Sequence, residues 1–344
     1  MNKFARKNVL VLGGAGFIGS HLVDSLLAQR ARVIVLDDLS SGSRKNLDFQ
    51  HPHLRFLQGD ISALEQRAAG SSLDEGIRDS DYVFFLASPI GLRLAHTRSL
   101  ETTTRILASG MNVVSLCLKH RRPILYTSSS EIYGAVSHRL LDEKDTSGFG
   151  LEPRWGYGAA KMAVEHLVAG LFREHRIPAT SARLFNVVGP RQNASTGLVL
   201  SAFAKAAVED GELIVHGDGT DRRTFLHVKD CVTALLAIAE SDELSGQSVN
   251  VGGSENISIN ELAELVIDAS GAGRITYKSY EEVYGDHFVP VGDRRPNLDL
   301  LMRTTGWTPK HSLADAIRDC IDDLQSGISK RIAAVESANG RPID

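Results

Sequence analysis

The stretch NVLVLGGAGFIG, residues 8–19, joins a short apolar run to three closely spaced glycines. Its apolar first half predicts a buried strand, and Ser20–Ala28 predicts the helix that comes after the loop. Gly13, Gly16 and Gly19 permit a tight turn and a close approach of the backbone to a pyrophosphate. The free N–H groups at the start of the helix favour negative charge. Because strand, glycine loop and helix occur in this order, the stretch predicts a dinucleotide-binding site.

Similar apolar runs recur through the first half of the chain and alternate with helical stretches. Several are continuous rather than alternating, which is typical of a parallel sheet covered on both faces. The pattern predicts an α/β fold with a doubly wound parallel sheet, a Rossmann domain, over residues 1–189. A short run at 249–251 is expected to return to this sheet. The predicted strands are Asn8–Leu12, Arg32–Leu36, Leu54–Leu57, Tyr82–Leu86, Pro123–Tyr126 and Thr180–Leu184.

The character of the sequence changes after residue 189, where loops lengthen and helices become isolated. Residues 190–329 are predicted to form mainly a smaller, C-terminal substrate-binding lobe. Ser258–Glu261 has the pattern of a capping box at the start of a helix, and Ser312–Asp315 begins another helix in a similar way. Residues 330–344 lack a sustained apolar pattern and are expected to form a flexible tail.

The composition narrows the class of protein. The chain has 344 residues, 42% hydrophobic and 23% charged, which is typical of a soluble globular protein. The net charge of -4 gives no indication of a nucleic-acid partner, so an anionic ligand needs a local pocket of positive charge. Cys117, Cys231 and Cys320 are widely spaced, which predicts small buried side chains and neither disulfides nor a metal site.

The sequence also bears on localisation. No apolar run reaches the roughly 18 residues that a membrane span needs. The N-terminus leads directly into the first predicted strand and lacks the pattern of a signal peptide. A cytoplasmic protein without a membrane partner is therefore expected.

An acidic residue lies where the glycine loop requires one. Asp37 ends the second predicted strand, about 20 residues beyond the loop, where a carboxylate can hold the adenosine ribose hydroxyls. A carboxylate there repels a 2′-phosphate, which favours NAD over NADP. Asp38, Ser40 and Gly42 come next in a turn-like run, and residues 59–61 come after the third strand; both runs are either cofactor contacts or ordinary capped loops. The predicted cofactor-binding residues are Gly13, Gly16, Phe17, Ile18, Gly19, Asp37, Asp38, Ser40, Gly42, Asp60, Ile61, Leu86, Ala87, Tyr157 and Lys161.

Tyr157 and Lys161 lie four residues apart at the start of a predicted helix and share one of its faces. A lysine beside a tyrosine is expected to lower the pKa of the phenol from about 10. Such a tyrosine can take a hydroxyl proton while hydride leaves the same carbon for NAD. An exposed pair on a helix surface is the alternative interpretation, and the glycine loop upstream favours the catalytic one.

Polar residues come directly after the predicted strand at Ile124–Tyr126. The run TSSSEIYG, residues 127–134, therefore lies at the carboxyl end of a parallel strand, where such sheets bind their ligands. Hydroxyl groups at this place can bridge the tyrosine and the reacting oxygen of a substrate.

Taken together, these motifs resemble the extended short-chain dehydrogenase/reductase family, in its nucleotide-sugar epimerase, dehydratase and decarboxylase branch. The resemblance extends over nearly all of the chain from Asn8 to about Leu324. The motifs that carry it are Gly13-x-x-Gly16-x-x-Gly19, Asp37-Asp-Leu-Ser-Ser-Gly42, Ser128-Ser-Ser-Glu-Ile-Tyr-Gly134, Tyr157-x-x-x-Lys161, Arg183-Leu-Phe-Asn-Val-Val-Gly-Pro-Arg191, Gly217-Asp-Gly219 with Arg223-Thr-Phe225, His227-Val-Lys-Asp230 and Arg294-Arg-Pro296.

The resemblance implies a substrate and a role for several residues. The substrate is a nucleoside-diphosphate sugar, most readily a UDP-sugar. Asn186 and Arg223 are expected to grip its diphosphate, with Arg294 near the phosphates or the sugar, because the planar guanidinium makes paired hydrogen bonds to phosphate. Arg191 or Arg294 is expected to meet a carboxylate on the sugar. The implied catalytic residues are Ser129, Glu131, Tyr157 and Lys161.

Members of this branch oxidise the sugar transiently, usually at C4, and then differ in the fate of the keto sugar. The Ser130-Glu131 pair resembles the UDP-glucuronate decarboxylases, as do residues 86–90 and 153–155. Decarboxylation is therefore placed slightly ahead of 4-epimerisation, with dehydration third. A non-enzymatic NAD-binding regulator on the same fold is the alternative from another class; the intact pair of Tyr157 and Lys161 argues against it.

Two further expectations come from the family likeness. Where the family often has His-Leu-Ala-Ala, this chain has Phe85-Leu-Ala-Ser88, which is expected to lose a polar group near the cofactor. Family members often dimerise through two helices in each subunit, and the candidates here are Ala108–Lys119 and Tyr157–Leu171. Both carry apolar residues on more than one face, as a helix covered on two sides requires, so a homodimer is expected.

Overall fold

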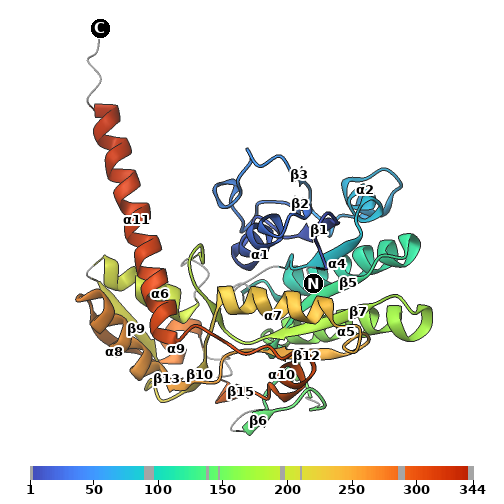
Figure 1. The fold of residues 1–344 in the computed structure, drawn as a ribbon. Helices are drawn as coiled ribbons and strands as arrows, with labels where there is room; N and C mark the ends of the chain where they lie inside the picture. The colour runs from blue at the N-terminus through green and yellow to red at the C-terminus, as the bar shows by residue number, and fades with distance from the viewer. Residues whose placement is uncertain are drawn as a thin grey trace.

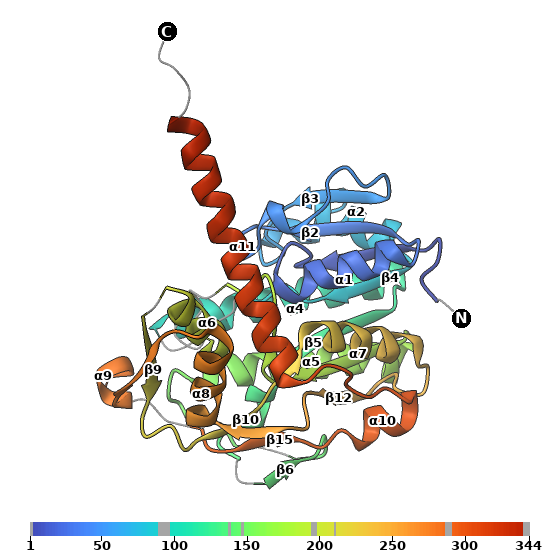
Figure 2. The same cartoon turned by 60° about the vertical axis from the view of Figure 1, so that its left-hand side comes forward.

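A central sheet of seven parallel strands organises the protein (Figures 1 and 2). The computed structural model describes residues 3–88, 97–136, 139–145, 148–193, 198–209, 211–285 and 291–339, with side chains described as far as Gly327. The strand order is β12-β7-β5-β4-β1-β2-β3, which confirms the predicted doubly wound fold. The strands are β1 (Asn8–Leu12), β2 (Arg32–Asp37), β3 (Leu54–Gln58), β4 (Tyr82–Phe85), β5 (Ile124–Ser129), β7 (Ala179–Leu184) and β12 (Ser248–Val251).

Helices cover both faces of this sheet, which explains the continuous apolar runs in its strands. In β1, Val9 and Val11 pack into the core on one face, whereas Leu10 and Leu12 pack into the core on the other. Successive side chains of a strand point to opposite faces, so a strand buried on both sides needs apolar residues at every position. One face is covered by α1 (Phe17–Ala28), α7 (Val228–Glu240) and α10 (Asp299–Thr305), the other by α2 (Ser72–Asp79), α4 (Ser99–His120) and α5 (Trp155–His175).

Strand β12 returns to the large sheet late in the chain, as expected for residues 249–251. It pairs in parallel with β7, with Val249 opposite Ala182. Within the range 190–329, α7, β12 and α10 therefore pack with the Rossmann part, and most of the remaining elements form the smaller lobe.

The lobe has its own apolar core, which is separate from the two cores of the Rossmann part. Its helices are α6 (Val199–Val208), α8 (Ile259–Ser270), α9 (Tyr280–Tyr284) and α11 (Leu313–Asn339), of which α6, α8 and α11 supply most of the core. Ser258 and Glu261 form the predicted capping box at the start of α8. The strands outside the large sheet are β6 (Arg139–Leu141), β8 (Val187–Val188), β9 (Glu212–His216), β10 (Arg222–Thr224), β11 (Leu226–His227), β13 (Asn256–Ser258), β14 (Arg274–Lys278) and β15 (Arg294–Pro296).

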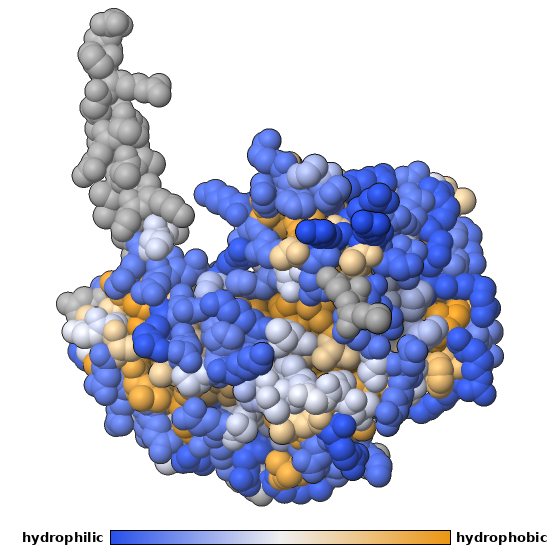
Figure 3. All heavy atoms as spheres, viewed as in Figure 1, coloured by the Kyte–Doolittle hydropathy of each residue, from blue (hydrophilic) through white to orange (hydrophobic). Residues whose placement is uncertain are grey.

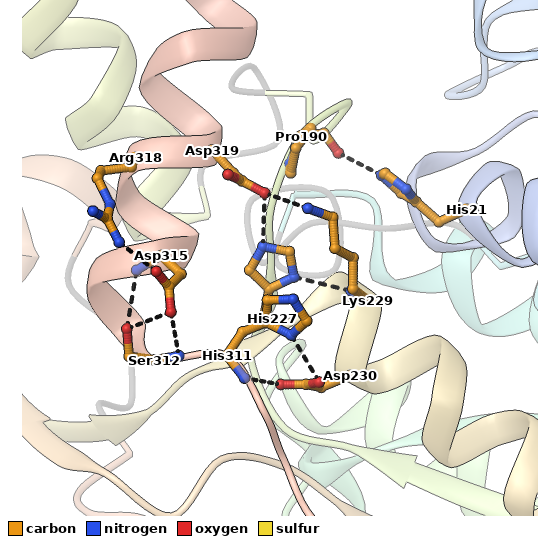
Figure 4. A network of polar contacts seen from close by, with 10 residues as sticks. All are labelled: His21, Pro190, His227, Lys229, Asp230, His311, Ser312, Asp315, Arg318 and Asp319. Carbon is orange, nitrogen blue, oxygen red and sulfur yellow. Dashed lines mark hydrogen bonds and ion pairs between the residues drawn. The ribbon is translucent and has the colours of Figure 1, made fainter.

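Helix α11 is tied to the Rossmann part by a polar network (Figure 4). Asp319 of α11 accepts a hydrogen bond from Lys229 Nζ at 2.8 Å and contacts His227 Nε2 at 3.2 Å. The ring of His227 stacks on His311, with 4.5 Å between centroids, and His311 contacts Asp230 at 2.9 Å. His227 also caps α7, because its Nδ1 accepts a hydrogen bond from the backbone N–H of Lys229.

Beyond this network α11 leaves the body of the molecule and runs to Asn339 (Figures 1 and 2). The backbone is therefore helical over most of the stretch that the sequence predicts as a flexible tail. Alanine, glutamate, lysine and arginine are frequent between residues 330 and 339, and these are good helix formers even without an apolar face.

Cys117, Cys231 and Cys320 are buried and free, as the sequence predicts. Among the helices in the described ranges, none has both the length and the apolar character needed to cross a membrane.

Candidate active site

A cavity of about 900 Å³ lies at the carboxyl ends of β1, β4 and β5, with walls from both the Rossmann part and the lobe. In the view of Figure 3, apolar surface lies between the upper and lower parts of the molecule. The predicted site residues that line the cavity are Gly13, Gly16, Phe17, Ile18, Gly19, Asp37, Asp38, Ser40, Asp60, Ile61, Leu86, Ala87, Ser129, Glu131, Tyr157, Lys161, Asn186 and Arg223.

The glycine loop lies where the strand order reverses, between β1 and β4. Gly13 has a φ of +80°, and a Cβ on it would lie 2.7 Å from the backbone nitrogen of Ala87 after β4. A Cβ on Gly19 would lie 2.1 Å from the carbonyl oxygen of Gly13, so the helix can pack this closely only without a side chain. A Cβ on Gly16 would meet only that same carbonyl, at 3.3 Å, and Gly16 lines the cavity. The loop thus presents bare backbone to a ligand, as a pyrophosphate requires.

Asp37 connects the end of β2 to the glycine loop. Its carboxylate accepts hydrogen bonds from the backbone N–H groups of Ala15 at 2.9 Å and Leu39 at 2.8 Å. Burial raises the pKa of Asp37, and these two bonds oppose the rise. Gly42, also predicted to bind the cofactor, is not among the described residues of the cavity wall. It packs behind the loop instead, where a Cβ would lie 2.8 Å from the carbonyl carbon of Ala15.

A charged bridge that the sequence did not reveal lies beside Asp37. Arg105 of α4 donates to Asp38 at 2.7 Å and to Asp60 at 3.1 Å, and all three side chains line the cavity. The partners come from the ends of β2 and β3 and from a helix more than forty residues later. Their association depends on the fold, so no local pattern indicates it.

Tyr157 and Lys161 lie on the first two turns of α5, with both side chains facing the cavity. The Tyr157 hydroxyl is hydrogen-bonded to Ser129, at the end of β5, and to Ser88, after β4. Lys161 Nζ donates to the carbonyl of Thr127 at 3.0 Å and lies 5.7 Å from the centroid of the Tyr157 ring. Two hydroxyl groups and an amine are therefore grouped around one phenol.

The pKa values in this cluster differ from the sequence-based expectation. Burial, reinforced by the negative charge of Glu131, raises the pKa of Tyr157 to about 12, although the bonds from Ser129 and Ser88 lower it. Burial also lowers the pKa of Lys161 to about 7. The expected lowering of the tyrosine pKa by a charged lysine is thus wrong for the protein alone, because both groups lie out of water, where each loses its charged form.

Ser88 belongs to the segment in which this chain departs from the family pattern. The sequence predicts the loss of a polar group there, and the structure places the Ser88 hydroxyl against Tyr157. Phe85, in the position of the family histidine, packs on the buried ring of Tyr126 at 5.0 Å between centroids. A polar contact with Tyr157 therefore exists here, and the residue that supplies it lies three positions after Phe85.

Glu131 lies between two arginines. Arg294 donates to one carboxylate oxygen at 2.7 Å, and Arg154 lies 3.6 Å from the other. Burial opposes the ionisation of Glu131, but the positive charges of Arg294 and Arg154 outweigh burial and lower its pKa. Arg294 also donates to the carbonyl of Gly134. The side chain of Arg294 is buried and is not among the described residues of the cavity wall, so its expected contact with substrate stays a prediction and its observed partner is Glu131.

The other predicted substrate residues separate into two groups. Asn186 and Arg223 line the cavity at the lobe. Arg223 donates to the carbonyls of Gly292 at 3.1 Å and Val291 at 2.6 Å, which hold its guanidinium in place.

Arg191 belongs elsewhere. It pairs with Asp24 of α1 at 2.8 Å and is absent from the described wall of the cavity. Its expected contact with a sugar carboxylate finds no support in this position and stays a prediction. Arg191 has a positive φ of 65°, and its guanidinium contacts α1 through Asp24.

Comparison with known proteins places this site in a family. The model of the family described as "NAD dependent epimerase/dehydratase family" matches residues 9–252. The UDP-N-acetyl-alpha-D-glucosaminuronate decarboxylase of Bacillus cytotoxicus is 28% identical over 319 residues, covering 92% of this chain and 97% of that protein. UDP-glucuronic acid decarboxylase 5 of Arabidopsis thaliana is 30% identical over 340 residues, covering 96% and 94%.

A solved structure agrees with these relatives. The UDP-N-acetylglucosamine 4-epimerase of Methanobrevibacter ruminantium M1, in complex with UDP-N-acetylmuramic acid, superposes with a TM-score of 0.82. It is 26% identical, and the match covers 94% of this chain and 99% of that one. The glycine loop, with the open face at Gly16, and the ribose position at Asp37 fit NAD. The chain therefore belongs to the NAD-dependent epimerase/dehydratase family and is an enzyme whose cofactor is NAD.

Proposed function

We propose that the protein oxidises a UDP-linked uronate at C4 and decarboxylates it. The observation that carries the proposal is the ionised Glu131, held by Arg294 at 2.7 Å in the wall beside Tyr157. A carboxylate at this place, after a serine, is the feature that distinguishes the decarboxylase pattern from that of simple 4-epimerases. The two relatives described above, both named as uronate decarboxylases, match over more than 90% of the chain.

The side chains around the phenol divide the work of the oxidation step. Bound NAD would supply the acceptor for the hydride that leaves C4 of the sugar. Tyr157 takes the proton of the C4 hydroxyl, and the hydroxyls of Ser129 and Ser88 donate to its oxygen and stabilise the negative form. Lys161, once protonated, adds positive charge beside the phenol. The phenolate of Tyr157 is therefore favoured more when Lys161 is protonated and the substrate is bound than in the protein alone.

The oxidised sugar is a β-keto acid, and its C5–C6 bond breaks as carbon dioxide leaves. The electron pair of that bond moves toward the C4 ketone, and C5 then takes a proton. Glu131 orients the sugar in this step, and Arg294 reduces the repulsion between Glu131 and the sugar carboxylate. Asn186 and Arg223 hold the diphosphate at the lobe side of the cavity.

A second candidate is 4-epimerisation of a UDP-sugar. It is favoured by the overall likeness to the solved 4-epimerase described above. In that reaction the hydride returns to the other face of C4, and Glu131 serves only as a wall of the pocket.

One experiment separates the two candidates. Purified enzyme is incubated with UDP-glucuronate and with UDP-glucose, and carbon dioxide and the sugar products are monitored by NMR. We expect carbon dioxide from UDP-glucuronate, and a loss on the order of 100-fold in Glu131→Gln with UDP-glucuronate binding retained. Glu65→Gln is the matched control, because Glu65 is an exposed glutamate that is not among the described residues of the cavity wall. Interconversion of glucose- and galactose-type sugars without carbon dioxide, and with little effect of Glu131→Gln, would establish the epimerase instead.

We further propose that the enzyme is a homodimer through α4 and α5. Met111 and Leu118 lie two turns apart on α4 and are 48% and 36% exposed, and Leu167 of α5 is 39% exposed. Their inward-facing neighbours already pack α4 against α5 and the sheet. Apolar side chains on the outward face of a helix pair are typical of an interface, and two copies can form a four-helix contact.

A further inference from the structure

Arg105 is an arginine of the cavity wall to which the sequence assigned no role. It lies on the second turn of α4 and reaches the ends of β2 and β3, which are adjacent in the large sheet. A single nitrogen atom, Nη2, donates to Asp38 at 2.7 Å and to Asp60 at 3.1 Å. The Arg105 side chain therefore spans this end of the cavity, between α4 and the edge of the sheet.

Both acids that hold Arg105 are themselves fixed by their own loops. Ser40 donates to Oδ1 of Asp38 through its backbone N–H at 2.9 Å and its hydroxyl at 2.6 Å. Ser62 holds Oδ1 of Asp60 in the same way, at 2.9 and 2.7 Å. Each acid thus keeps its other oxygen, Oδ2, for Arg105. The guanidinium is therefore held in one place before any ligand binds.

The two bonds leave part of the guanidinium unused. Within the described residues, Nε and Nη1 of Arg105 make no hydrogen bond. The side chain is 32% exposed and lines the cavity. The planar group is therefore anchored at one corner and accessible to a ligand from the cavity.

The position of Arg105 indicates which part of a ligand it meets. Asp37, the residue before Asp38, ends β2 where the adenosine ribose is predicted to bind. Leu36 and Ile61 line the cavity at the ends of the same two strands and supply apolar surface there. An adenine ring is flat, aromatic and uncharged, and a guanidinium stacks well on such a ring. Because Arg105 is already fixed by two acids, the contact costs little conformational entropy.

We propose that Arg105 binds the adenine of NAD by stacking its guanidinium on the ring, and that it thereby slows the release of the cofactor. Asp38 and Asp60 act as positioning residues that hold the guanidinium over the base. The contact serves decarboxylation and epimerisation alike, because both begin from bound NAD. The inference therefore does not depend on which of the two reactions the enzyme performs.

The test measures how fast the nucleotide leaves. Enzyme loaded with NADH is mixed with excess NAD in a stopped-flow instrument, and the change in NADH fluorescence gives the release rate. Titration calorimetry gives the Kd of UDP on the same loaded enzyme. We expect Arg105→Met to release NADH on the order of 10-fold faster than the wild type, with the Kd of UDP unchanged. Arg105→Lys, which keeps the charge and loses the planar group, should release NADH nearly as fast as Arg105→Met.

The controls separate stacking from charge and from folding. Arg98→Met removes an exposed arginine at the start of the same helix and should release NADH at the wild-type rate. An unchanged release rate in Arg105→Met would overturn the inference. So would a wild-type rate in Arg105→Lys, which would show that positive charge alone matters at this place. Weaker binding of UDP in both Arg105 variants, to the same extent as NADH, would show a general structural role and overturn it as well.

Discussion

Arg294 and Glu131 form an ion pair at 2.7 Å across 163 positions of sequence, in the wall of the candidate site. The arginine is 5% exposed at its side chain and the carboxylate 26%, so the pair is partly shielded from water. Removal of one partner of such a pair leaves an unpaired charge that is partly shielded from water. Removal of both partners leaves no unpaired charge. The pair thus keeps the Glu131 carboxylate ionised and fixed near Tyr157.

This ion pair predicts that substitutions at Arg294 and Glu131 have strongly non-additive effects on the free energy of unfolding. Arg294→Met should lower the free energy of unfolding by about 3 kcal/mol, because Glu131 and the Gly134 carbonyl lose their donor. Adding Glu131→Gln should recover part of that loss. Urea denaturation of the wild type, both single variants and the double variant measures the coupling. Additive losses in the double variant would contradict the prediction.

Tyr157→Phe should abolish turnover while binding of NADH and UDP stays unchanged, because only the hydroxyl is removed and the ring still packs. The loss should exceed tenfold, about 1.4 kcal/mol in the barrier. Tyr126→Phe is the matched control, since the Tyr126 hydroxyl has no hydrogen-bond partner in the described part of the chain. Steady-state rates on UDP-glucuronate decide the matter, and activity within tenfold of wild type would exclude Tyr157 as the base.

The buried amine of Lys161 predicts a pH dependence of stability in the protein without ligands. Its pKa falls from 10.5 to about 7 on folding, so between these values the unfolded chain holds a proton that the folded protein lacks. Unfolding therefore becomes harder as pH rises through this window, by up to about 1.4 kcal/mol per pH unit from this group. Below pH 7 the contribution no longer changes. Denaturant titrations from pH 7.5 to 9.5 should show that the free energy of unfolding rises more steeply with pH in the wild type than in Lys161→Met. Parallel curves for the two proteins would refute the prediction.

Asp37 should set the preference for NAD over NADP. The carboxylate lies at the end of β2, where the ribose is predicted to bind, and Arg105 nearby is already paired with Asp38 and Asp60. Asp37→Ala should weaken NADH and narrow the difference between NADH and NADPH, because the repulsion of a 2′-phosphate falls. Fluorescence titration with both nucleotides measures this, with the exposed Asp48→Ala as control. If the wild type prefers NADPH, the assignment of Asp37 to the adenosine ribose is wrong.

The outward faces of α4 and α5 should hold two copies together. Replacing both Met111 and Leu167 with lysine places charges in the proposed interface and should convert the dimer to a monomer. Leu265→Lys, at an equally exposed leucine on α8, should leave the dimer intact. Light scattering at micromolar concentration gives the mass, and a monomeric wild type would contradict the proposal.

The sequence by itself determined the features that depend on neighbours along the chain. The glycine loop, the strands around it and the pairing of Tyr157 with Lys161 on one helix face come from local spacing. The continuous apolar runs indicated a sheet covered on both sides, and β12 was expected from its run alone. These features depend on local backbone conformation and on the periodicity of apolar residues, and both can be predicted from the order of residues along the chain.

Only the tertiary structure decided which distant groups meet and how their charges behave. Arg294 pairs with Glu131, Arg191 pairs with Asp24 of α1, and Arg154 lies in the cavity wall. The raised pKa of Tyr157 and the lowered pKa of Lys161 likewise come from burial by the whole fold. Electrostatic energies depend on distance in space and on the exclusion of water, and neither quantity can be obtained from residue order.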